Sequence, residues 1–187
     1  MKKRIARAVI GVGLLLPVYS LADNNVVTVT GLTSGAFGDP SDATIPFVVG
    51  IKVSGAAVIT VTATGCVTDV GISCVTPDGF SFTGGVTPLQ EAGLVPITDP
   101  HVDGLIGAFV PAVTASNPNF KAIDSTKAVC SPGPCIDRTQ LFFIGASKVF
   151  SVNEAGTLYL GIDDFIVDDN GGFFTVTVSS VLCACGG

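Results

Sequence analysis

The segment "GTLYLGIDDFIVDDNGGFFTVTV" (residues 156–178) places two predicted β-strands on either side of an acidic loop. Its residues 175–178, Thr-Val-Thr-Val, alternate polar and apolar side chains with the period of a strand that buries one face. Similar runs of Val, Thr and Phe recur along the chain with turn residues between them. They occupy 26–32, 46–55, 56–65, 104–110, 141–147, 148–152, 156–164 and 172–182. We therefore predict an all-β protein with the fold of an antiparallel sandwich or jelly roll.

The loop between these two strands is rich in side-chain oxygen atoms. Within eight positions it holds Asp163, Asp164, Asp168, Asp169 and Asn170. A turn needs only one or two such residues. The surplus favours a hard cation such as calcium, which takes about six to eight oxygen ligands. An acidic hairpin closed by turns in which Asp or Asn side chains bond to the backbone is the alternative, and composition leaves it open.

Residues 1–22 form a predicted secretory signal peptide, which leaves residues 23–187 as a single domain. The segment has a basic start, a short apolar stretch and small residues before Ala22, where we expect cleavage. Cleavage removes four of the nine basic residues and none of the fifteen acidic ones, so the mature net charge is 5 − 15 = −10. This charge argues against binding to nucleic acid. No other segment is apolar and long enough to span a membrane. We expect a protein of the periplasm, the cell surface or the medium.

The cysteine pattern indicates disulfides. The six cysteines fall into three close pairs, which are Cys66 and Cys74, Cys130 and Cys135, and Cys183 and Cys185. In an exported chain an even number of paired cysteines is typical of disulfides rather than of a zinc site. We predict nearest-neighbour bonds within the first two pairs. The last two would lie on one face of a strand at a distance that suits a direct bond poorly, so we expect them to pair elsewhere or with another chain.

The sequence contains no set of residues that favours catalysis. Its only histidine, His101, lies in a Pro-rich loop and is not accompanied by a Gly-x-Ser-x-Gly motif. Adjacent aspartates in one turn cannot flank a glycosidic bond from opposite sides. No Gly-rich phosphate loop leads from a strand into a helix. We therefore predict a protein that is not an enzyme.

The segment 156–178 resembles the closing strands and calcium loop of the bacterial galactose-binding calcium lectins of the PA-I galactophilic type and their secreted homologues. In that family a strand ends in Asn-Asp, and a short loop leads to Asp-Asn-Ser-Gly. Asp164 matches the aspartate of the first pair, and Asp169 and Asn170 match the second. Asp163 and Gly171 depart from the pattern. Segments 50–65, 65–71, 76–80, 104–109 and 141–145 also resemble the family in order, so the resemblance covers about residues 45–180.

The resemblance implies a jelly-roll β-sandwich of the galactose-binding-domain-like type with a bound calcium ion. It implies side-chain ligands from Asp164, Asp169 and Asn170 and backbone carbonyl ligands near Ile166 and Asp69. In the lectins two neighbouring sugar hydroxyls complete the coordination. Here Asp164 and Asp169 would accept hydrogen bonds from these hydroxyls, and Phe165 is the expected apolar sugar contact.

The family's sugar-contacting His and Gln do not align with His101 and Gln90, so these roles are not transferred. The prediction is a secreted calcium-dependent carbohydrate-binding protein that forms homo-oligomers, and a galactose-type sugar is its candidate ligand. The alternative is a structural subunit of an extracellular fibre or coat, whose partners are copies of itself. Its subunits would be joined by strand exchange through residues 23–32 or by disulfides of Cys183 and Cys185.

Overall fold

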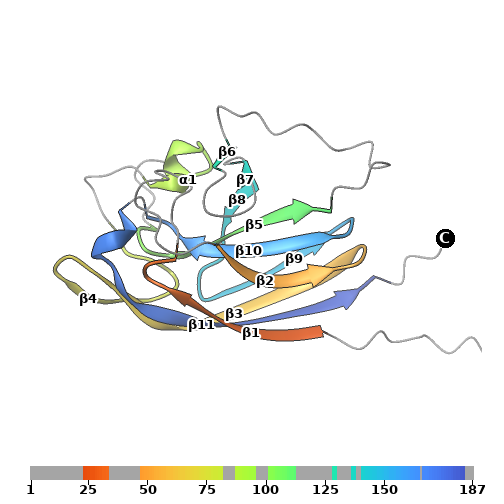
Figure 1. Cartoon of the computed structure of the whole chain (residues 1–187), viewed down its shortest axis with the longest axis horizontal. Helices are drawn as coiled ribbons and strands as arrows, with labels where there is room; N and C mark the ends of the chain where they lie inside the picture. Colours follow the sequence, from red (N-terminus) through yellow and green to blue (C-terminus); the bar gives the residue numbers. More distant parts are fainter. Residues whose placement is uncertain are drawn as a thin grey trace, which may run out of the picture.

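The chain folds as a jelly-roll β-sandwich of two antiparallel sheets (Figure 1). The computed structural model describes residues 23–33, 47–81, 87–95, 101–112, 128–129, 136–137, 140–164 and 166–183. The first sheet contains β1 (Asp23–Thr30), β11 (Gly171–Leu182), β3 (Ala57–Asp69), β4 (Ile72–Val75) and β9 (Ser147–Val152). The second contains β2 (Val48–Val53), β10 (Gly156–Ile162), β5 (Leu105–Pro111) and β8 (Leu141–Phe143). The short strands β6 (Ala128–Val129) and β7 (Ile136–Asp137) pair with each other.

The strand order confirms the predicted jelly roll. The first sheet runs β1-β11-β3, with β9 and β4 pairing with different stretches of β3, and the second runs β2-β10-β5-β8. Along the chain, β1, β2 and β3 alternate between the sheets, and so do β8, β9, β10 and β11. This alternation interleaves the first and last strands in both sheets, which is the double Greek key of a jelly roll. It also makes β10 and β11 central strands, so the loop between them is held from both sides.

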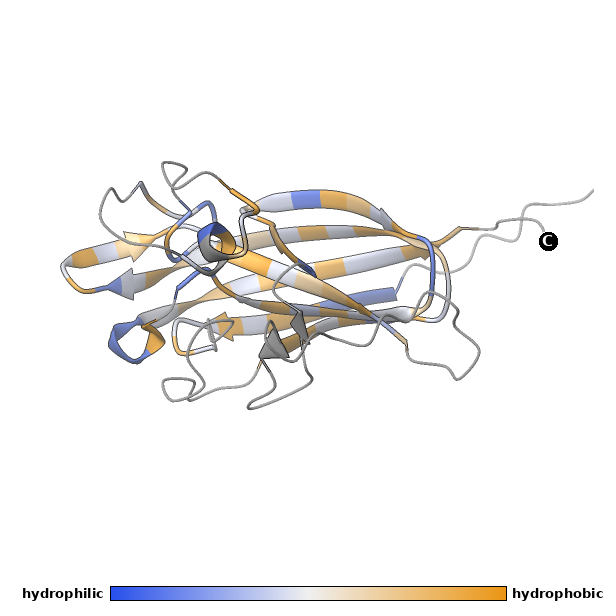
Figure 2. Ribbon diagram, turned by 90° about the horizontal axis from the view of Figure 1, so that it is seen from above, coloured by the Kyte–Doolittle hydropathy of each residue, from blue (hydrophilic) through white to orange (hydrophobic). Residues whose placement is uncertain are grey.

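The core lies between the two sheets and follows from the period-two pattern. In β11, Phe174, Val176 and Val178 are fully buried, whereas Phe173 is 52% exposed. Figure 2 shows the same alternation as apolar and polar bands along the strands. A second, smaller cluster covers the other face of the four-stranded sheet and consists of Phe47, Leu89, Ile106, Ala108 and Leu141. β10 is therefore buried on both faces, and this agrees with its nearly continuous apolar sequence.

One short helix, α1 (Pro88–Glu91), lies over this second cluster. Its start is a capping box, because Thr87 N donates to Gln90 Oε1 at 2.7 Å and Gln90 N donates to Thr87 Oγ1 at 3.4 Å. The sequence analysis predicted no helix here. No helix among the described residues is long and apolar enough to cross a membrane.

Two strand boundaries also differ from the sequence prediction. β8 ends at Phe143, because Gly145 adopts a φ of +70° and turns the chain before β9. β4 was not among the predicted strands, since four residues are too few for a clear alternation. It forms because β3 continues to Asp69 and folds back at Gly71, which has a φ of +81°.

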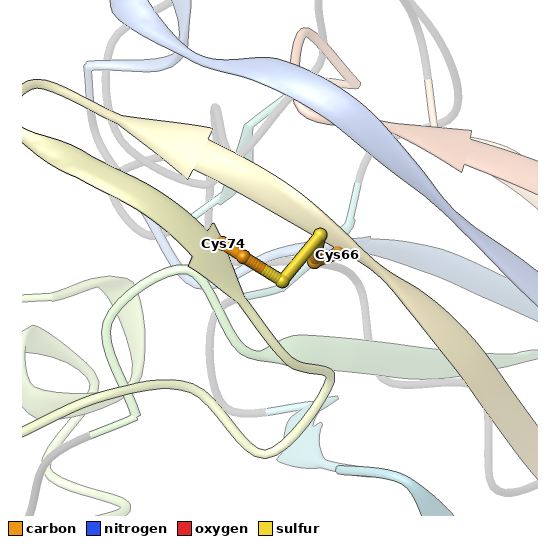
Figure 3. Close-up of a disulfide and its surroundings, with 2 residues drawn as sticks. All are labelled: Cys66 and Cys74. Atoms are coloured by element: carbon orange, nitrogen blue, oxygen red, sulfur yellow. A yellow bond between two sulfur atoms is a disulfide. The ribbon is translucent and has the colours of Figure 1, made fainter.

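A disulfide joins Cys66 of β3 to Cys74 of β4, as predicted (Figure 3). It ties the β3–β4 hairpin together at the end of the sandwich where the loop after β10 also lies (Figure 1). Cys183 is exposed and forms no disulfide with another described residue. The predicted signal peptide and Cys130, Cys135 and Cys185 lie outside the described residues.

Candidate functional site

The loop between β10 and β11 is organised around Asp164. Ile166 N donates to Asp164 Oδ1 at 3.1 Å, and the Asn170 side-chain amide donates to Asp164 Oδ2 at 2.8 Å. The loop closes through the 3₁₀ turn η2 (Val167–Asp169), in which Asn170 N donates to Val167 O at 3.3 Å. Val167 is fully buried and anchors this turn. The sequence thus brings Asp164 and Asn170 together as predicted, with Asp169 exposed beside them.

The β3–β4 hairpin brings Asp69 to the same site. Asp69 Oδ1 accepts a hydrogen bond from Val70 N within the turn. The negative charge of Asp69 reaches Asp169, where it adds to partial desolvation in raising the pKa of that carboxyl group. The predicted role of the Asp69 backbone as a calcium ligand stays a prediction.

A third loop contributes an aspartate that the sequence analysis did not single out. Asp103 lies just before β5 with a φ of +58° and a fully buried side chain. Its backbone N donates to Asp163 O at 3.3 Å, and Asp163 N donates to Gly104 O at 2.9 Å. These two bonds fix Asp103 beside the end of β10. Neither carboxylate oxygen of Asp103 has a hydrogen-bond partner within the described part of the chain.

The pKa of Asp103 is shifted by its burial and by the charges of nearby residues. Burial, together with the smaller effects of the negative charges of Asp164, Asp69 and Asp169, raises the pKa of Asp103 to about 8. The Asn170 side chain opposes the shift, although its contact with Asp103 lacks the geometry of a regular hydrogen bond. The carboxyl group of Asp103 is therefore influenced by acidic residues of the two other loops.

Asp163 is equally buried but serves a different contact. Its Oδ1 accepts a hydrogen bond from Leu89 N at 3.1 Å, and so it caps helix α1 from the end of β10. Burial is the main cause that raises the pKa of Asp163 to about 7, and the hydrogen bond from Leu89 N limits this rise. The adjacent carboxylates of Asp163 and Asp164 thus bond to different elements, which are α1 and the acidic loop.

The donor set has the chemistry of a hard-cation site. Asn170 is 7% exposed, and its Oδ1 has no hydrogen-bond partner among the described residues. Buried oxygen atoms without a donor are rare and destabilising unless they bind something. In the described part of the chain, however, no three His, Cys, Asp or Glu side chains already lie in a metal-binding arrangement. A cation would therefore have to replace the hydrogen bonds that Asp164 makes to Ile166 and Asn170.

Of the predicted site residues, Asp164, Asp169, Asn170 and Asp69 come from two loops at one end of the sandwich. Ile166 is 56% exposed in side chain, and only its backbone was predicted to bind. Phe165 lies outside the described residues, so its predicted sugar contact stays a prediction. Asp103 was missed because no local pattern in its loop distinguishes it from a turn residue.

Comparisons with known proteins give similarity at the level of solved structures. No protein-family model matches the chain, and no curated protein matches it. A solved structure described as the EclA N-terminal domain, a PllA-like lectin, is similar with 18% sequence identity and a TM-score of 0.42. The similarity covers 83% of this chain and 94% of that chain. A likeness at this level does not identify the family or the ligand of this chain.

Proposed function

We propose that the chain is a secreted, non-catalytic protein that binds carbohydrate through a calcium ion held at the acidic end of the sandwich. The observation that carries the proposal is the buried Asn170 Oδ1, which has no partner in the described structure and lies beside Asp164. An amide oxygen next to carboxylates is a ligand set typical of calcium. The sequence resemblance to calcium lectins points to the same loop.

The side chains of Asp164, Asp169 and Asn170 would hold the ion, and backbone carbonyls near Ile166 and Asp69 would complete the protein ligands. When bound, calcium supplies open coordination positions for two neighbouring hydroxyl groups of a sugar. Asp164 and Asp169 would accept hydrogen bonds from these hydroxyls, and charged acceptors strengthen such bonds. Asp169 is exposed, so a ligand can approach it from solvent. A galactose-type sugar is the first candidate.

Isothermal titration calorimetry of calcium into the chelator-treated protein tests this proposal. The wild type should bind calcium, and the Asp164→Ala, Asp169→Ala double variant should not. A glycan array with and without a calcium chelator then tests sugar binding. If both proteins bind calcium, the ion binds elsewhere than at this loop. If neither protein binds calcium, the proposal is wrong.

The fibre-subunit alternative is favoured by one observation. β1 is an edge strand that pairs only with β11 within the first sheet, from Asp23↔Ser180 to Thr30↔Phe173. Edge strands of this kind can be exchanged between copies of a chain. Because β1 already fills this position within its own chain, exchange would require it to leave. Gel filtration and non-reducing electrophoresis test the alternative, and a monomer in both would exclude it.

A further inference from the structure

Among the described residues, Asp103 has a buried carboxylate of which both oxygen atoms lack a hydrogen-bond partner. Its side chain is 0% exposed. A buried charge without a partner destabilises a fold by several kcal/mol, in the range of about 3–5 kcal/mol when one member of a pair is missing. Such a side chain indicates either a bound proton or a bound cation.

The backbone at Asp103 carries a second cost. Its φ of +58° is the only positive φ of a non-glycine residue in the described structure. A left-handed conformation in a residue with a Cβ costs about 1–2 kcal/mol. The bonds between Asp103 N and Asp163 O and between Gly104 N and His101 O, at 3.3 Å and 2.7 Å, hold this conformation. The fold therefore holds this carboxylate in a fixed place next to β10.

The neighbours of Asp103 are acidic or neutral. Its carboxylate is influenced by Asp164, Asp69 and Asp169 and by the Asn170 amide. No lysine or arginine of the described chain contributes to its pKa. A positive partner therefore has to come from outside the described residues, and the neighbouring carboxylates attract one.

We propose that Asp103 is a direct ligand of the cation bound by the 164–170 loop, so that the site is built from three loops and includes a fully buried carboxylate. This inference rests on the proposed function, because it assigns a further ligand to the same ion. Asp103 lies just before the start of β5, and the Asn170 side chain, which donates to Asp164 Oδ2, also acts on Asp103. An ion bound to Asp103 would lie further from solvent than an ion bound only to the exposed Asp169.

The rival role for Asp103 is a neutral, protonated acid that fills a polar pocket. The Asp103→Asn variant separates the two roles. Asparagine has almost the same shape and remains neutral, so it can replace a protonated acid, but it lacks the charge that a calcium ligand supplies. Asp163→Asn is the matched control, because Asp163 is also 0% exposed but bonds to Leu89 of helix α1.

The test is calorimetric titration of calcium into four metal-free proteins: the wild type, Asp103→Asn, Asp163→Asn and the Asp164→Ala, Asp169→Ala double variant. Each uses the full chain, expressed with its own N-terminal segment. Even indirect partners of a metal contribute about 10- to 100-fold in affinity. We therefore expect Asp103→Asn to weaken calcium binding at least about 100-fold, and Asp163→Asn to remain close to the wild type.

The possible outcomes separate this inference from the proposed function. Wild-type affinity in Asp103→Asn, together with loss of binding in the double variant, would overturn the inference and leave the proposed function standing. A wild type that binds no calcium would remove both. Thermal unfolding without calcium shows whether Asp103→Asn folds. Calcium should raise the melting temperature of folded Asp103→Asn by less than it raises that of the wild type and of Asp163→Asn. An equal rise in all three proteins would contradict the inference.

Discussion

The stability of the metal-free protein should depend on pH through Asp103. Its pKa is raised from 3.8 to about 8 in the folded state, chiefly by burial. The folded state therefore keeps a proton that the unfolded state releases. Stability from this group is fully present below about pH 4 and is lost as the pH rises to about 8. Each pKa unit corresponds to about 1.4 kcal/mol, so a shift of about four units sets an upper bound of about 6 kcal/mol.

Urea unfolding followed by circular dichroism measures this effect when the wild type is compared with Asp103→Asn. The variant does not titrate at this position, so carboxylates that do not interact with Asp103 cancel in the difference between the two unfolding free energies, and the difference reports Asp103 together with its acidic neighbours. We expect the wild type to lose stability relative to the variant by several kcal/mol between about pH 4 and about pH 8 in metal-free buffer. A difference that stays constant over this range would refute the burial of an uncompensated carboxylate at Asp103.

Three further predictions concern the scaffold. Phe174→Ala should lower the free energy of unfolding by about 3–5 kcal/mol, because the ring is fully buried. Phe173 is 52% exposed, so Phe173→Ala should lower this free energy by well under half as much, as measured by denaturant unfolding. Gly172→Ala should lower the melting temperature, because Gly172 has a φ of +71° and an added Cβ would lie 2.5 Å from Cys66 O. Reduction of the Cys66–Cys74 disulfide should lower the free energy of unfolding by about 2–3 kcal/mol, since this disulfide closes a short loop. Equal unfolding curves with and without reductant would contradict this prediction.

The strands were predictable from sequence because their patterns are local. Alternation in β11 determines which side chains enter the core, and the same reasoning gave β3, β5 and β10 within a few residues. The Cys66–Cys74 bond followed from close spacing in an exported chain. The two-sheet architecture followed from the number and length of such strands.

Two features of the site region were not predicted, and for different reasons. The start of helix α1 has a local signal that was overlooked, since Thr87, Pro88 and Gln90 form a capping box with proline at the first helical position. Asp103 has no local signal. Its importance depends on hydrogen bonds with the end of β10, which is distant in sequence and adjacent only in the folded sheet.

Asp163 and Asp164 bond to different elements, so the acidic loop alone supplies too few oxygen ligands for a calcium ion. Of the oxygen-rich residues in 163–170, Asp163 caps helix α1, which leaves chiefly Asp164, Asp169 and Asn170 for an ion. Calcium takes about six to eight oxygen ligands. These three side chains, two backbone carbonyls and Asp103 together supply about six, so a sugar diol would raise the number to the upper limit of about eight. If Asp103 binds the ion, a sugar therefore replaces at most two water molecules, and the site has no room for a third hydroxyl ligand.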